Sequence, residues 1–140
     1  MLICLEGHQL VTLSSAEVMR DVIDEVGSPW VGVDFDPVNW ITVNAVFQSA
    51  AAIQSMLETL GDRIVAGHLK DVWLRDEMVV HLEPRAPGQG MLDIGAQLVG
   101  MHELNPDAPI IVEATDTVDL PGAVSHLRAL AARHELEIRS

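Results

Sequence analysis

Hydrophobic and polar positions along this chain follow two alternating periods. Short apolar runs occur at 2–7, 30–36, 63–71 and 109–114, and a longer segment with apolar residues every three or four positions follows each of them. The short runs predict strands and the longer segments predict helices, so the pattern predicts four consecutive βα units. Parallel strands need crossover connections, which the helices supply, and the predicted fold class is therefore α/β with a parallel sheet.

Local signals mark several ends of these elements. Ser14 and Glu17 have the spacing of a capping box at the start of the first helix, and Gly27 is placed to end it. The fourth helix is expected to begin near Leu120 and to bury Val124, Leu127 and Leu130. Between the third strand and the third helix lies an irregular excursion, residues 72–90, in which 77–84 predict a short hairpin arm. Residues 134–140 are expected to add a short strand or to fray.

Two α/β architectures are compatible with four βα units in a single domain spanning residues 1–140. One is an open doubly wound sheet, and the other is a piece of a (β/α)8 barrel. A whole barrel takes about 250 residues, whereas this chain has 140. Length alone therefore favours the open sheet.

Charge and composition exclude some classes of binding partner. The chain has 8 Lys and Arg against 21 Asp and Glu, a formal net charge of −13, which repels phosphate backbones and anionic membrane surfaces. Neither nucleic acid nor a membrane is therefore an expected partner. No apolar run approaches the roughly 20 residues of a membrane helix, and the opening "MLICLEGH" lacks the features of a signal peptide. A cytoplasmic location is expected.

Each predicted strand carries a polar residue near its carboxyl end. In parallel α/β sheets this edge is where sites are built, and period-two alternation puts one such residue on one face of each strand. Three of these residues are carboxylates and one is a histidine. The carboxylates would repel one another strongly with no cation between them, so a divalent cation is expected. Mixed oxygen and nitrogen ligands suit manganese, magnesium, cobalt or zinc. The four residues are Glu6, Asp36, His68 and Glu113.

Each of these residues also has a structural interpretation. A carboxylate or histidine at a strand end, taken singly, is more often a helix cap, a solvated loop residue or a hydrogen-bond partner than a metal ligand. Four such residues at corresponding positions of neighbouring strands favour a metal site. Asp34 lies on the same predicted face as Asp36, one pleat deeper, and is expected to be a hydrogen-bonding neighbour of the ligands.

Five segments in order carry a resemblance to a known family. They are "CLEGH", "GVDFDPVN", "GHLKD", "PGQGMLD" and "IIVEAT". At these separations they resemble the second half of the sugar phosphate isomerase/epimerase family with the xylose isomerase-like TIM barrel, strands five to eight, over nearly the whole chain. The resemblance implies metal ligands at Glu6, Asp36, His68 and Glu113. It also implies that Glu6 and Glu113 move a proton on and off a carbon next to a carbonyl, through an enediolate, on a small sugar or polyol substrate.

The resemblance supplies further candidates for substrate binding. Arg85 precedes "APGQG" much as a substrate-binding arginine precedes a Pro-Gly-x-Gly turn in the family's epimerases. Each candidate has an equally common structural interpretation, such as a cap, a turn or a surface charge. The candidates are His8, Asn39, Lys70, Asp71 and Arg85.

Other functions in the same superfamily stay open. Asn39 stands three residues after Asp36, where many relatives have a histidine, and the apurinic endonucleases of the superfamily need that histidine for a three-metal cluster. The asparagine and the charge of −13 therefore disfavour an endonuclease-type hydrolase. A metal-dependent dehydratase or lyase is a further alternative, and so is a non-catalytic half-barrel module.

A barrel of this family has four more βα units before the position of Met1. Without them the first and last strands of this chain are open edges. The chain is expected to be a fragment of a longer barrel that lacks its N-terminal half. The alternative is a half-barrel that pairs with a second copy. On its own the chain is not expected to be a competent catalyst.

Overall fold

The computed structural model describes residues 1–114 and 116–138, and within them strands and helices alternate as predicted. Four parallel strands form a sheet in the order β1-β2-β3-β6. The strands are β1 Ile3–Leu5, β2 Val31–Phe35, β3 Ile64–Leu69 and β6 Ile110–Val112. The helices that follow them are α1 Ala16–Val26, α2 Ser49–Leu60, α3 Ile94–Leu104 and α4 Leu120–Arg133. The α/β class with a parallel sheet is confirmed.

The ends of α1 show how closely local signals locate a helix. Ser15, with extended backbone, caps the helix by accepting a hydrogen bond from the Val18 N–H at 3.3 Å, so the prediction of Ser14 as the cap is wrong by one residue. At the other end Gly27 has a φ of 60° and donates its N–H to the Ile23 carbonyl, as predicted. Glycine tolerates this left-handed conformation at no steric cost.

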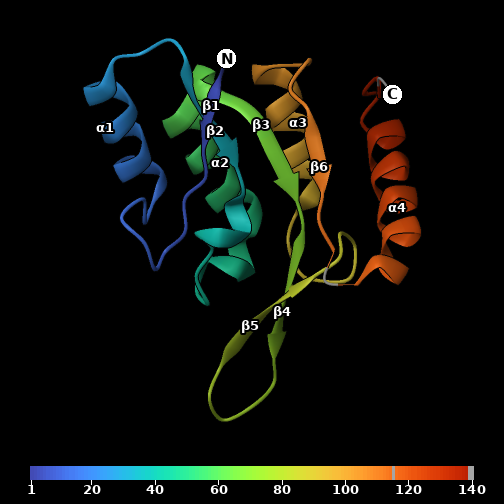
Figure 1. The fold of residues 1–140 in the computed structure, drawn as a ribbon. Helices are drawn as coiled ribbons and strands as arrows, with labels where there is room; N and C mark the ends of the chain where they lie inside the picture. The colour runs from blue at the N-terminus through green and yellow to red at the C-terminus, as the bar shows by residue number, and fades with distance from the viewer. Residues whose placement is uncertain (115, 139–140) are drawn as a thin grey trace.

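The hydrophobic core lies between the sheet and the helices (Figure 1). Val33 and Phe35 are fully buried on the helix side of β2, against Met19 of α1 and Ile53 of α2. Burying a side chain of this size stabilises the fold by roughly 1.5–3 kcal/mol. Because side chains alternate along a strand, residue 34 between these two faces the opposite side of the sheet. That opposite side carries the polar residues.

The two outer strands leave apolar side chains open. β1 pairs only with β2, and β6 only with β3, among the described residues. Ile3 is 50% exposed and Ile111 is 48% exposed. Val124 of α4, expected to be buried, is 37% exposed and lines an apolar groove between α4 and β6. The prediction of its burial, made from helical spacing, is therefore wrong in this structure.

The excursion after β3 forms a hairpin arm. β4 Asp71–Arg75 pairs antiparallel with β5 His81–Arg85, and the arm stands out beyond the carboxyl end of β3 (Figure 1). The predicted hairpin is confirmed, although it begins at Asp71 rather than Glu77. Short 3₁₀ turns complete the connections, at Pro37–Asn39, Ala45–Gln48, Gly61–Arg63 and Thr117–Asp119.

The chain end after α4 has no strand over residues 134–138, so of the two expectations for this segment the added strand is wrong there. Arg139 and Ser140 lie outside the described residues. Within the part of the chain that the structure describes, every helix falls short of the length and apolar character needed to cross a bilayer.

Candidate metal centre

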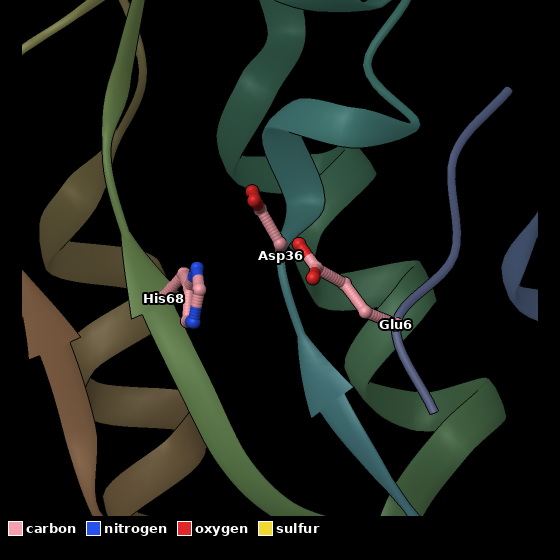
Figure 2. Close-up of side chains that lie close together, drawn as sticks. All are labelled: Glu6, Asp36 and His68. Carbon is pink, nitrogen blue, oxygen red and sulfur yellow. The ribbon is translucent and has the colours of Figure 1, made fainter. Parts of the chain in front are cut away.

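Three of the four expected ligands converge at one edge of the sheet (Figure 2). Glu6 follows β1, Asp36 follows β2 and His68 belongs to β3, and one ligand atom from each lies within 4.8 Å of the other two. Two donors bound at 2.0–2.2 Å to one ion are at most about 4.4 Å apart. Three atoms within 4.8 Å of one another lie within about 2.8 Å of a common point, so side-chain movements of less than about 1 Å bring the three donors around a single ion.

The chain around Glu6 and Asp36 fixes both carboxylates. Trp40 packs against Gly7 so closely that a Cβ there would collide with its ring, and its indole N–H donates to the Leu13 carbonyl at 3.0 Å. Glu6 Oε1 accepts a hydrogen bond from Asn39 Nδ2 at 2.9 Å. Asp36 Oδ1 accepts the Val38 N–H at 3.1 Å and so caps the short 3₁₀ turn after β2. Oδ2 of Asp36 is therefore the oxygen left to face the site.

His68 is held from several sides. Its carbonyl accepts a hydrogen bond from Nε2 of Gln97 at 2.8 Å, and Gln97 is a fully buried residue of α3. Its ring contacts Glu113 Oε2 through Nδ1 at 3.0 Å and Asp34 Oδ2 through Nε2 at 3.4 Å. Sequence reasoning missed Gln97, although a glutamine on the buried face of an apolar helix is a signal for such a contact.

Glu113 is not part of the cluster formed by the other three, but it contacts one of them, His68. Its Oε2 contacts the His68 ring and its Oε1 lies 3.3 Å from Lys70 Nζ, so both oxygens have partners. The side chain is 44% exposed, which leaves it room to turn. Its role as a fourth ligand stays a prediction.

Lys70 lies in the middle of these carboxylates. It is only 9% exposed, and its Nζ is 2.7 Å from Asp36 Oδ2 in addition to its contact with Glu113. An ammonium group is rarely buried unless it is paired, and here it is paired twice. The structure thus gives Lys70 an ion-pairing position beside the expected ligands, which the sequence did not reveal.

Four carboxylates face one ammonium and one imidazole, and burial together with these charges shifts several of their pKa values. Burial raises the pKa of Asp36, and nearby Glu113 and Glu6 raise it further, although pairing with Lys70 acts in the opposite direction. Burial also raises the pKa of Asp34, and attraction to His68 offsets only part of the increase. Both directions follow mainly from burial, which disfavours the ionised carboxylates, and a nearby cation offsets such a cost.

The cationic side and the outer carboxylate shift to match. Burial lowers the pKa of Lys70, but pairing with Asp36 and Glu113 outweighs burial and raises it above its ordinary value. For Glu113 burial acts to raise the pKa, but hydrogen bonds and attraction from His68 and Lys70 outweigh it and lower the pKa. Lys70 is therefore held charged and Glu113 is held ionised.

The residues present fit a divalent ion. Asp34 Oδ1 is buried and has no hydrogen-bond partner among the described residues, and burial, which raises the pKa of Asp34 and Asp36, penalises their ionised forms unless a cation lies near. Carboxylate oxygens with one imidazole nitrogen form a donor set suited to manganese, magnesium, cobalt or zinc.

A small cavity of about 120 Å³ opens beside the centre. Three of the expected substrate-binding residues line it, namely His8, Asn39 and Lys70, and apolar side chains that include Leu82 and Pro84 of β5 form another wall. His8 Nδ1 accepts the Leu10 N–H at 3.1 Å, so its other ring nitrogen is left for the cavity. The arm therefore forms one side of the space next to the ligands.

Asp71 has a structural role in place of the substrate contact expected from the sequence. Its side chain is 1% exposed, and its two oxygens accept four backbone N–H groups, from Val72, Gly88, Gly90 and Leu92, at 2.8–3.1 Å. Gly90 has no Cβ, which leaves room for the carboxylate. Asp71 thus ties the loop before α3 to the base of the arm.

Arg85 also lies away from the expected position. Leu82 and Pro84 of β5 line the cavity, so alternation puts Arg85 on the other face of the strand. There its guanidinium pairs with Glu83 Oε2 at 2.9 Å, and Arg75 pairs with the same carboxylate. In this structure Arg85 belongs to an ion-pair network on the outer face of the arm and does not face the candidate site.

These features place the chain among the (β/α)8 barrel proteins, of which it forms four βα units. The chain belongs to the xylose isomerase-like TIM barrel family, whose model matches residues 2–137. That family is mostly enzymatic and includes isomerases, epimerases and endonucleases.

Solved structures show the same fold. A xylose isomerase domain protein from Planctomyces limnophilus superposes with a TM-score of 0.72 at 23% identity, covering 95% of this chain and 46% of that one. A xylose isomerase-like TIM barrel protein from Mycobacterium smegmatis, in complex with magnesium, superposes with a TM-score of 0.72 at 13% identity, covering 94% of this chain and 43% of that one. The chain thus spans less than half the length of these neighbours. A search of curated proteins finds no match.

Proposed function

We propose that the chain carries the metal centre of a metal-dependent sugar or sugar-phosphate isomerase or epimerase. The observation that carries the proposal is the convergence of Glu6, Asp36 and His68 at the carboxyl ends of neighbouring strands, next to a cavity with polar lining. The family to which the chain belongs and the magnesium bound by the Mycobacterium smegmatis protein support it.

Glu6, Asp36 and His68 would hold the ion, with Glu113 turning in as the fourth ligand. When bound, the ion supplies a Lewis acid that stabilises negative charge developing on a substrate oxygen. The excess of carboxylates described above is what such an ion would neutralise.

Glu6 and Glu113 are the proposed proton carriers. They come from the two outer strands of the sheet, so a substrate between them is reached by one carboxylate on each side. Asn39 holds Oε1 of Glu6, while His68 and Lys70 lower the pKa of Glu113 and keep it ionised, as a proton acceptor must be. Deprotonation at one face and reprotonation at the other inverts a carbon next to a carbonyl.

The cavity residues would orient the substrate. His8, Asn39 and Lys70 line the space, and Asn39 also bonds Glu6. These are the positions where hydroxyl groups of a sugar or polyol would be bound, and the apolar wall from the arm excludes water from the reacting carbon.

The test is hydrogen exchange at carbon in deuterated water. With manganese or magnesium present, the whole barrel that contains this chain is expected to exchange the hydrogen next to the carbonyl of a ketose or ketose phosphate above the rate in buffer. Glu6→Gln and Glu113→Gln should each reduce this exchange by about 100-fold or more, because a positioned acid or base contributes 10²–10⁴. Deuterium incorporation followed by proton NMR measures both.

Glu103→Gln is the matched control, since Glu103 is an exposed carboxylate near the end of α3. It should exchange like the wild type. Loss of water from the substrate instead of exchange would favour a dehydratase, and hydrolysis of an abasic oligonucleotide would favour an endonuclease. An exchange rate that is unchanged in Glu6→Gln contradicts the proposal.

The edges of β1 and β6, unpaired among the described residues, indicate how the rest of a barrel would join this chain. We propose that a second set of four βα units closes the barrel against β1 and β6. An apolar groove of about 280 Å³ between α4 and β6, exposed Ile3 and Ile111, and coverage of only 46% of a structural neighbour support this proposal. Two copies of this chain would place two sets of strand-end carboxylates in one barrel mouth, at −13 charges each. The second set is therefore expected to have a different sequence.

Light scattering after size exclusion checks this expectation on the 140-residue chain. No defined dimer is expected, and ketose turnover by the chain alone should be far below that of a whole barrel. A sharp, homogeneous particle of twice the chain mass contradicts the proposal and indicates that two copies pair through their open edges.

A further inference from the structure

Lys70 is the only lysine in the sequence, and its ammonium lies beside the carboxylates of the candidate metal centre. Its side chain is 11% exposed, and the Asp36 side chain that it contacts is completely buried. The second contact, with Glu113 Oε1 at 3.3 Å, places the ammonium between two of the expected metal ligands. The Lys70 ammonium therefore neutralises part of the negative charge of these carboxylates in this structure.

The contact with Asp36 involves the oxygen that an ion would need. Asp36 Oδ1 is already bonded to the Val38 N–H, so Oδ2 is the oxygen available for a ligand bond. Oδ2 lies 2.7 Å from Lys70 Nζ, and among the described residues no other group is its hydrogen-bond partner. This charge-assisted contact is what holds Oδ2, and a stronger cation can take the place of the ammonium.

A divalent ion and the ammonium cannot both contact Asp36 Oδ2 at low cost. Two cations on one buried oxygen would lie a few ångströms apart in a poorly solvated space, where like charges repel strongly. One of them must leave, and the lysine has the flexible stem. Lys70 already lines the cavity with His8 and Asn39, so a short rotation takes its ammonium there.

We propose that Lys70 is an exchangeable stand-in for the metal: it neutralises Asp36 and Glu113 in the metal-free protein, and metal binding displaces its ammonium from Asp36 into the substrate cavity. This inference rests on the proposed metal-dependent function and deepens it. It makes Lys70 a positioning residue whose positive charge reaches the cavity only after the metal is bound, where it faces substrate oxygens.

Calorimetric titration with manganese tests the competition. Lys70→Gln and Lys70→Met remove the competing cation, so they are expected to bind manganese at least 10-fold more tightly than the wild type, a gain of about 1.4 kcal/mol. Lys70→Arg keeps the charge and should bind more weakly than either. Arg128→Gln, which removes one positive charge from the exposed face of α4, should stay within about 2-fold of the wild type.

A spectroscopic readout on the wild type tests the displacement itself. Because the chain has one lysine, ¹⁵N-lysine labelling gives a single side-chain Nζ signal. Magnesium, which is diamagnetic, should shift that signal along the same binding curve that calorimetric titration with magnesium reports. This measurement decides the question even where Lys70→Gln and Lys70→Met fail to fold, as circular dichroism would show.

The outcomes separate this inference from the function on which it rests. Tighter binding by the neutral variants, or binding by these variants alone, supports the exchange of lysine for metal, as does the coupled Nζ shift. Equal affinity in folded wild type and Lys70→Gln, or an unmoved Nζ signal while magnesium binds, overturns the exchange and leaves the metal centre intact. Absence of binding in every folded protein overturns the metal centre, and the exchange with it.

Discussion

Replacing Asp71 with alanine is expected to lower the free energy of unfolding by about 3–5 kcal/mol, since each buried donor left without a partner costs roughly 1–3 kcal/mol. The carboxylate accepts four backbone N–H groups, two on each oxygen, and is 1% exposed. Alanine would leave these donors unpaired and open a void beside Gly90. The loop before α3 would lose its attachment to the base of the arm.

Urea denaturation followed by circular dichroism measures this effect through the midpoint of the transition. Asp62→Ala is the control, because the Asp62 side chain is 88% exposed and its ion pair with Arg20, at 3.8 Å, is the one found among the described residues. A surface pair of that kind contributes about 0–1 kcal/mol. A midpoint for Asp71→Ala equal to that of Asp62→Ala would show that the four hydrogen bonds do not stabilise the loop.

The order of strands and helices could be predicted because it depends on local periodicity. Strand alternation also predicted that Glu6, Asp36 and His68 share the open side of the sheet, and parallel pairing then brings them together at one edge. Both steps need only the spacing of residues along the chain and one rule of sheet geometry. The fold class and the centre of the site were therefore within reach of the sequence.

The remaining features depend on contacts between distant segments. Asp71 is bound by residues 88–92, and nothing in "HLKD" indicates that the loop returns to it. Lys70 enters the ion pairs because β3 ends beside Asp36 and Glu113, 43 positions away from Glu113 in sequence. Arg85 faces outward because the hairpin begins at Asp71, which sets the parity of β5. One-residue shifts of this kind reverse the face of every following side chain.

Replacing His68 with alanine is expected to abolish stoichiometric binding of a divalent ion. Loss of an outer contact to a metal ligand commonly lowers affinity by 10–100-fold, so loss of a ligand should lower it by about 100-fold or more. The substitution also removes the contacts of the His68 ring with Asp34 and Glu113, so these two carboxylates lose a partner that holds them in position. His102→Ala is the matched control, because His102 lies in the last turn of α3 and outside the cluster formed by Glu6, Asp36 and His68.

The central claim is that Glu6, Asp36 and His68 bind one ion together. Its most direct test is metal analysis after equilibrium dialysis of the wild type, His68→Ala and His102→Ala against manganese. We predict one manganese ion per chain in the wild type and in His102→Ala, and none retained by His68→Ala. Equal manganese content in His68→Ala and the wild type, or none in the folded wild type, would contradict the claim.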